Sequence, residues 1–324
     1  MIKLNMVSSV PAVAESVSST RQGNKTKRRK EDTMNDLIKK YKEDLQLSGY
    51  AERSIDSYAS SVIRLQRFYN KPLEDITEEE LRQYWICCQS DFGWSPASLR
   101  ISYSGIQHFF TKTVVQDWKI FSDINWKREE KLPTILSLPE VKKIIYALPT
   151  QQSHTFYLAL YSMGLRLREA TSLQVRDILS DRKLVHIHGG KGRKDRTVPL
   201  PDITLKALRE YYKTHFNPKW IFPALGHDNG KNAGTAKGHV SDTGVQGVLR
   251  STLQKLNFKK HVHPHVFRHA YATHLLEANI PIRHVQKILG HKTLKSTMIY
   301  LHVTTLAEED SNERVAQLMQ GVLS

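Results

Sequence analysis

The sequence predicts a mainly α-helical protein with one small antiparallel β-sheet, an α+β fold divided between two domains. Apolar residues recur at helical spacing through most of the chain, and a β-type texture occurs only at 174–200. A charged connection at 122–134, which contains Pro133, separates the two helical halves. With 324 residues, of which 40% are hydrophobic, the chain is long enough to build two cores of ordinary size.

The first half, residues 33–121, is expected to form a helical domain of four helices. Apolar spacing predicts helices at 34–47, 51–69 and 95–113. A capping box from Thr77 to Glu80 opens the remaining helix, which we expect to run through Trp85. Aromatic residues such as Phe109 and Phe110 are interpreted as core rather than as base-stacking platforms.

The second half begins with another capping box, from Ser137 to Glu140. Strands are expected around Val185 and Ile187 and at 197–200, joined by the tight basic turn GGKGRKD at 189–195. The Gly-, Asn- and Lys-rich stretch 224–240 is expected to be a mobile loop. Periodicity predicts the remaining helices at 138–147, 153–163, 167–173, 203–214, 242–256, 265–278, 281–289 and 294–303.

Charge points to a polyanionic partner. Lys and Arg outnumber Asp and Glu by 48 to 32, which gives a net charge of +16. Nucleic acid is favoured over an acidic membrane surface, because no long amphipathic basic helix and no apolar run of about 20 residues is present. The two cysteines are adjacent, at Cys87 and Cys88, which argues against a structural disulfide and favours a reduced, cytoplasmic setting.

The N-terminal 32 residues are expected to form a disordered basic arm. Six of the ten residues at 21–30 are basic. This arm is either a solvated tail or a segment that follows the DNA backbone. In the second case its DNA-binding candidates are Lys27, Arg28, Arg29 and Lys30. On the basic hairpin at 189–196, Arg193, Lys194 and Arg196 are further DNA-binding candidates.

A histidine-rich stretch, HVHPHVFRHAYATH at 261–274, raises the question of a metal site. His265 and His269 are four residues apart, as zinc ligands on a helix often are. No neighbouring carboxylate or thiolate completes a ligand set, so no metal is expected. His261, His263 and His274 are interpreted as satisfied core histidines without an assigned function.

The same stretch is better suited to binding a phosphate than to binding a metal. Pro264 favours a helix start, where backbone N–H groups attract an anion. His265 and Arg268 are three residues apart and can project together from the first turn. An arginine fork binds two phosphate oxygens, and a histidine can exchange a proton near neutral pH.

Further motifs follow one another along the chain. G-L-R-L-R-E at 164–169 places Arg166 at a helix opening, and the hairpin at 189–196 carries Lys191, Arg193, Lys194 and Arg196. H-V-F-R-H at 265–269 comes next, followed by Leu289-Gly290-His291 and, nine residues later, Tyr300. In this order the motifs resemble the tyrosine recombinase family, also called phage integrases, and the first half is similar to the family's SAM-like core-binding domain.

The resemblance implies a role for each matching residue. Arg166 and Arg268 would clamp the scissile phosphate, and Tyr300 would attack phosphorus to leave a 3′-phosphotyrosyl enzyme. Lys191, with Lys194 as competitor, would protonate the 5′-oxygen. His265 would assist proton transfer and His291 would orient a phosphate oxygen. Glu169 and His269 would have structural roles: Glu169 would brace an arginine, and His269 would buttress a helix.

The resemblance also implies a site-specific DNA recombinase without a cofactor. Its fold would be a C-clamp around double-stranded DNA, built from the core-binding domain (33–121), a linker (122–134) and a catalytic domain (135–304). Four protomers would form the synaptic complex, in which the tail at 305–324 is a candidate contact between protomers. Localisation would be cytoplasmic, in association with the bacterial nucleoid.

Several alternatives stay open. Integron integrases carry additional sequence in the second half, as this chain does in the long loop at 224–240. IFP at 221–223 before the loop and STMIYLHV at 296–303 after it are similar to that subgroup. Resolution of dimers by a Xer-like enzyme, a relaxing topoisomerase, a metal-dependent hydrolase and a non-catalytic DNA-binding protein on the same scaffold are the other readings.

Overall fold

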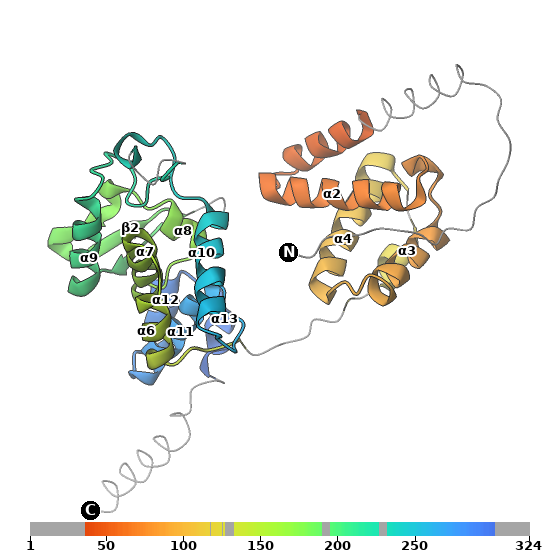
Figure 1. The fold of residues 1–324 in the computed structure, drawn as a ribbon. Helices are drawn as coiled ribbons and strands as arrows, with labels where there is room; N and C mark the ends of the chain where they lie inside the picture. The colour runs from red at the N-terminus through yellow and green to blue at the C-terminus, as the bar shows by residue number, and fades with distance from the viewer. Residues whose placement is uncertain are drawn as a thin grey trace, which may run out of the picture. The chain divides into compact units, whose positions relative to one another are not determined.

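The computed structural model describes residues 36–116, 118–124, 126, 133–189, 195–226 and 232–301 (Figure 1). The chain divides into two compact units, Met1–Glu130 and Lys131–Ser324, and this division lies inside the connection expected at 122–134. The arm at 1–32, the tail at 305–324 and the hairpin residues Lys191, Arg193 and Lys194 lie outside the described residues.

The first unit is helical, as expected. Its elements are a helix at 36–47, α2 (Glu52–Tyr69), α3 (Glu78–Ser90), α4 (Pro96–His108) with a π-helical continuation (Phe109–Val114), and the short α5 (Ile120–Asp123). α4 packs along α2 and also contacts α3. Phe109 and Phe110 are fully buried, which confirms their interpretation as core.

Local signals decide where these helices begin better than where they end. The Thr77 hydroxyl accepts the Glu80 N–H at 3.3 Å while Glu80 accepts the Thr77 N–H at 2.8 Å, so the capping box is confirmed. α3 continues to Ser90 rather than ending near Trp85, because no Gly or Pro interrupts it before Gly93. α5 was not expected; its first N–H, on Ile120, donates to the distant Glu78 Oε1 at 2.6 Å.

The second unit packs its helices around α7. They are α6 (Leu138–Tyr146), α7 (Gln151–Ser162), α8 (Leu167–Thr171), α9 (Asp202–Tyr212), α10 (Asp242–Lys255), α11 (Pro264–Glu277), α12 (Ile282–Leu289) and α13 (Lys295–Met298). α7 contacts α6, α8, α9 and α11, and the core around it includes the fully buried Phe156, Tyr157 and Phe267. α13 is shorter than the helix expected at 294–303.

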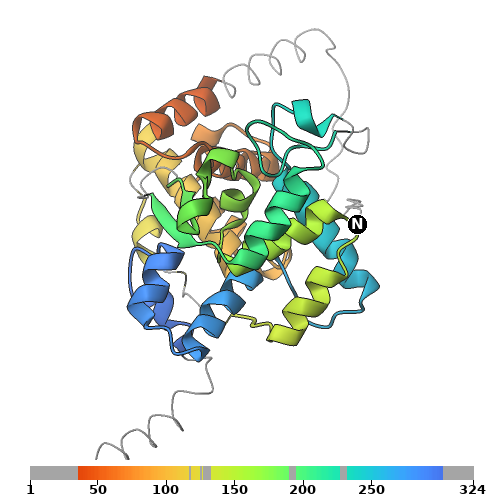
Figure 2. The same ribbon diagram turned by 90° about the vertical axis from the view of Figure 1, so that its left-hand side faces the viewer.

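The small sheet lies beside α12. Strands β1 (Ile178–Leu179), β2 (Leu184–Ile187) and β3 (Arg196–Pro199) pair in the antiparallel order β1-β2-β3, with Ile187 opposite Arg196. The two-residue β1 is too short for sequence periodicity to detect. β3 contacts α12, and in both views the green strands lie close to the blue helices of the C-terminal part (Figures 1 and 2).

The described part of the stretch 224–240 is anchored, in contrast to the expected mobile loop. The buried amide of Asn217 donates to the carbonyls of Ala233, Gly234 and Ala236 at 2.9, 3.2 and 3.0 Å. Its carbonyl oxygen accepts the N–H groups of Lys219 and Trp220 at 3.1 and 2.9 Å. One buried side chain therefore holds this segment in place.

The helices in the described ranges are all too short or too polar to cross a lipid bilayer.

Candidate active site

Three separate segments of the second unit meet around the carboxylate of Glu169. The guanidinium of Arg166 donates to Glu169 Oε1 at 2.7 Å, and the Arg166 N–H donates to Oε2 at 2.8 Å. Arg196, the first residue of β3, forms a bidentate ion pair with Glu169, in which Nη1 donates to Oε1 and Nη2 donates to Oε2, both at 2.8 Å. Arg268 on α11 approaches Oε2 within 4.0 Å. One carboxylate therefore faces three arginines.

The arginines keep Glu169 ionised although it is buried. Burial alone would raise its pKa, but the hydrogen bonds and charge of Arg196, followed by the bonds from Arg166, lower the pKa to about 2. Three guanidinium groups against one carboxylate leave an excess of two positive charges in a site with little solvent exposure. Such an excess favours binding of an anion.

The end of α12 supplies one further acceptor to each of the three arginines. Arg196 Nε donates to the carbonyl of Ile288 at 2.9 Å, Arg268 Nη2 donates to that of Leu289, and Arg166 Nη2 donates to that of Gly290 at 3.3 Å. The last carbonyls of a helix lack partners within the helix and carry its negative dipole end. The arginines give these carbonyls hydrogen-bond donors and place positive charge at the negative end of the dipole. In this way α12 fixes the relative positions of the three arginines.

Arg268 is the most buried of the three. Its side chain is 4% exposed, and its Nη1 donates to the carbonyl of Gly164 at 2.6 Å. Burial, followed by the charge of Arg166, lowers the pKa of Arg268 to about 9, which still leaves it charged at neutral pH. Gly164 itself has a φ of +58°, and its Cα lies against the ring of Tyr271.

Replacing Gly164 by alanine should destabilise the second unit by about 2–4 kcal/mol. A Cβ at this position would meet Tyr271 Cδ1 at 2.5 Å, and the left-handed backbone adds its own penalty. Gly247→Ala in the middle of α10 is the matched control, because a Cβ there has nothing within 4 Å and should stabilise by about 0.5–1 kcal/mol. Urea unfolding of the two variants measures both effects; equal stability of Gly164→Ala and the wild type would contradict the packing described.

Tyr300 lies beside the arginine cluster, which consists of Arg166, Arg196 and Arg268 around Glu169. It is 4% exposed and packs on Ala272, Val285 and Leu289. Its hydroxyl lies 2.8 Å from His269 Nδ1. Burial raises the pKa of Tyr300, although the charges of Arg268 and Arg166 act in the opposite direction.

His269 is neutral at physiological pH. Burial, followed by the neighbouring His265 and His263, lowers its pKa to about 4. A neutral imidazole can accept the proton of the Tyr300 hydroxyl, a role that the expected function as a helix buttress does not include.

Two further histidines flank the cluster. The ring of His291 is stacked on that of Tyr300 with centroids 6.3 Å apart, and its Nδ1 lies 2.9 Å from the Thr297 hydroxyl. Burial, then Arg268, lowers the pKa of His291 to about 3. His265 is exposed on the first turn of α11, where desolvation and then Arg268 lower its pKa.

Arg196 was expected to contact DNA, but the structure gives it another position. Its side chain is 11% exposed, and its Nε, Nη1 and Nη2 all donate to protein acceptors. The strand pattern could have shown this, because Arg196 and Val198 share one face of β3, Leu200 continues the alternation one residue beyond it, and the latter two are core residues.

The histidines without an assigned function differ from one another. His274 is half-buried and its Nδ1 lies 2.9 Å from the Tyr161 hydroxyl, as a satisfied structural histidine would. His261 and His263 are exposed, so their interpretation as core histidines was wrong.

Comparison with known proteins gives matches over both units. The phage integrase family matches residues 134–306, and the phage integrase N-terminal SAM-like domain matches residues 37–120. A tyrosine recombinase of Thermosipho africanus is 31% identical over 281 residues, which cover 83% of this chain and 94% of the relative. The tyrosine recombinase XerA of Pyrococcus horikoshii is 29% identical over 297 residues, covering 92% of this chain and 99% of XerA.

Solved structures share the fold at lower identity. XerH recombinase bound to its difH substrate has a TM-score of 0.64 at 19% identity, covering 88% of this chain and 84% of XerH. A lambda integrase dimer bound to a core site has a TM-score of 0.66 at 17% identity, covering 82% of this chain and 76% of the integrase chain. The mainly helical architecture with a small antiparallel sheet is therefore a known one.

Proposed function

Because this chain belongs to the phage integrase family and is a tyrosine-type site-specific recombinase, we propose that Tyr300 is its nucleophile and that Arg166 and Arg268 bind the scissile phosphate. The observation that carries the assignment is the Tyr300 hydroxyl, 2.8 Å from the neutral His269 and beside an arginine cluster with two uncompensated positive charges. A nucleophile, a proton acceptor and an anion site thus adjoin one another.

In the proposed reaction, the Tyr300 oxygen forms a bond to phosphorus while the bond from phosphorus to the 5′-oxygen breaks. The tyrosine proton passes to His269, and Lys191 supplies a proton to the departing 5′-oxygen. Arg166 and Arg268 offset the charge that develops on the non-bridging oxygens. The phosphotyrosyl bond conserves the energy of the phosphodiester, so attack by a second 5′-hydroxyl reseals the strand without ATP.

His269→Gln should slow formation of the covalent adduct about 100-fold and leave DNA binding unchanged, because general-base assistance is removed while the arginines stay. Since the pKa of His269 is about 4, it stays neutral and able to accept a proton above that pH and loses this ability as the pH falls through it. Wild-type cleavage should therefore show no inflection from His269 between about pH 5 and 8.

The matched control is His274→Gln, which removes a histidine that bonds another tyrosine, Tyr161, through the same Nδ1 atom. Rates of adduct formation on a nicked DNA substrate, measured across pH for both variants, test the assignment. A His269→Gln variant as fast as His274→Gln would show that His269 only packs against Tyr300.

The function itself is tested with a nicked suicide substrate in excess EDTA and without ATP. A protein–DNA adduct that survives denaturing electrophoresis is expected. Its absence would favour a non-catalytic DNA-binding protein, and cleavage that disappears with EDTA would favour a metal-dependent hydrolase.

Several finer assignments belong to the same proposal. The two units would close as a clamp on double-stranded DNA, with Lys27, Arg28, Arg29 and Lys30 of the arm and Arg193 and Lys194 of the hairpin on the phosphate backbone. His265 would exchange protons at the phosphate and His291 would orient one of its oxygens. Catalysis would take place in the bacterial cytoplasm, at the nucleoid, where the DNA substrate is.

Assembly would be a homotetramer on two DNA duplexes, within a mobile-element or integron setting. The sequence STMIYLHV and the additional residues at 224–240 support the integron reading. Protein crosslinking on paired sites tests the tetramer, and truncation after residue 304 tests whether the tail takes part in it.

A further inference from the structure

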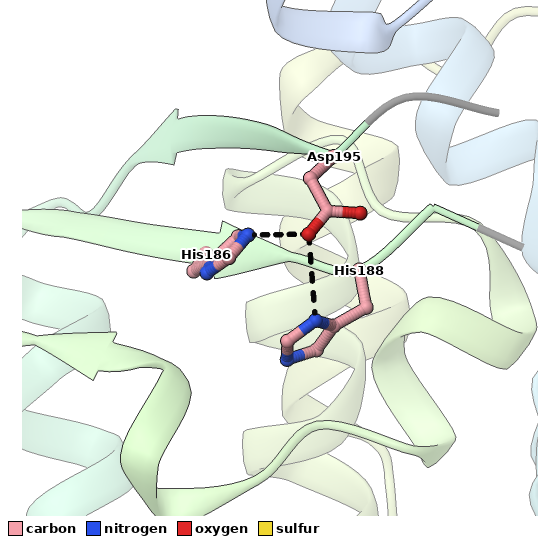
Figure 3. Close-up of side chains that lie close together, drawn as sticks. All are labelled: His186, His188 and Asp195. Atoms are coloured by element: carbon pink, nitrogen blue, oxygen red, sulfur yellow. Dashed lines mark hydrogen bonds and ion pairs between the residues drawn. The ribbon is translucent and has the colours of Figure 1, made fainter.

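A second group of histidines and acids lies at the base of the β2–β3 hairpin, outside the stretch 261–274. His186 on β2, His188 one residue beyond its end and Asp195 before β3 place one ligand atom each within 4.8 Å of one another. Figure 3 shows a carboxylate oxygen of Asp195 facing both imidazole rings. The side chains are 38%, 48% and 54% exposed, so an ion can reach them from solvent.

His188 is oriented by a buried carboxylate. Its Nε2 lies 2.8 Å from Asp177 Oδ1, and Asp177 is 4% exposed. The other oxygen of Asp177 accepts the Gln174 N–H at 2.9 Å, which fixes the carboxylate. A proton on Nε2 leaves the lone pair of a neutral His188 on Nδ1, directed at Asp195. Histidine ligands of metals are held in this way by a carboxylate on their second nitrogen.

Asp195 is fixed as well. Its Oδ1 accepts the Gly189 N–H at 2.8 Å, while Oδ2 lies 2.9 Å from His186 Nε2 and 3.7 Å from His188 Nδ1. In a tetrahedral zinc site with bonds of about 2.0–2.1 Å, ligand atoms lie about 3.3–3.5 Å apart. The two separations from Asp195 bracket this range, and all three ligand atoms lie within 4.8 Å of one another, so side-chain rotations would admit an ion.

We propose that His186, His188 and Asp195 bind one Zn²⁺ ion, with water in the remaining position. Two imidazole nitrogens and one carboxylate oxygen are a donor set that zinc accepts, whereas Mg²⁺ and Ca²⁺ prefer oxygen ligands. The ion would join the end of β2 to the start of β3 and so stiffen the strand that carries Arg196. None of the three proposed ligands has a role in the proposed reaction, and the occupancy of the site is measurable without DNA.

The test uses the full-length chain without a histidine tag, in a buffer that does not chelate metals. Calorimetric titration with ZnCl₂ should give one ion per protomer, and CoCl₂ should give the intense visible absorption of four-coordinate Co²⁺. His186→Ala and Asp195→Asn should each weaken Zn²⁺ binding at least about tenfold. These positions are preferred to His188, whose removal would also take a hydrogen-bond partner from the buried Asp177.

A variant with His261→Ala and His263→Ala is the matched control, because it removes two exposed histidines whose ring centroids lie 5.9 Å apart. It should bind Zn²⁺ as the wild type does. Loss of binding in this control, unchanged binding in His186→Ala and Asp195→Asn, or no saturable binding by the wild type would each overturn the proposal. In the last case the cluster would be an ion-pair network only.

Discussion

Tyr300→Phe should bind a nicked recombination site with wild-type affinity and form no covalent adduct. The substitution removes one oxygen from a ring that is 4% exposed, so the packing on Ala272, Val285 and Leu289 is preserved. Loss of the nucleophile of an enzyme lowers the rate by about 10⁴-fold or more, which places the variant below detection in an adduct assay.

Tyr161→Phe is a closely matched control, since Tyr161 also bonds a histidine Nδ1, that of His274, at 2.9 Å. This variant should form adduct at the wild-type rate. Denaturing gels of both variants with labelled DNA, together with a mobility-shift assay for binding, separate chemistry from affinity. Adduct of normal yield in Tyr300→Phe would remove Tyr300 from the mechanism.

Glu169→Gln should lower the free energy of unfolding by about 3–5 kcal/mol at pH 7, because three arginines would lose their one carboxylate inside the protein. The pKa of Glu169 is about 2 in the folded chain, below its ordinary value, so its ionised form stabilises the fold. This contribution is complete above about pH 5 and disappears as the pH falls toward 2. The stability gap between the variant and the wild type should close over that interval.

The same change should reduce cleavage about 10²–10³-fold, since Arg166 loses the acceptor that orients it. Asp202→Asn is the control, because Asp202 forms an exposed pair with Lys183 at 2.8 Å, and its loss should cost about 1 kcal/mol or less. Chemical denaturation at several pH values gives the stabilities. A Glu169→Gln variant within about 1 kcal/mol of the wild type at pH 7 would contradict the electrostatic account.

Patterns that are local in sequence predicted most of the fold. Helix starts at Thr77 and Ser137 followed from capping boxes, which depend on residues three positions apart. The interior contacts of Asn217 and the cap that Glu78 gives to α5 could not be predicted in this way. Both depend on partners that only the tertiary fold brings close.

The same distinction applies to the site. The spacing of motifs indicated which residue types should act together. One of them, Lys191, lies outside the described residues. Charge composition favoured a solvent-exposed Arg196, whereas the alternation Arg196, Val198, Leu200 indicates an inward side chain. The bond between His269 and Tyr300 joins residues 31 positions apart and depends on how α12 and α13 fold back on α11.

The carbonyls at the end of α12 also affect when activity can arise during protein synthesis. Gly290 follows Arg166 by 124 positions, which a ribosome needs roughly 6–25 s to translate at about 5–20 residues per second. Until residues 288–290 have emerged, the arginines lack these acceptors and cannot be buried together. Under the proposed mechanism, a chain released before Tyr300 is translated would lack its nucleophile and could not form a covalent adduct with DNA.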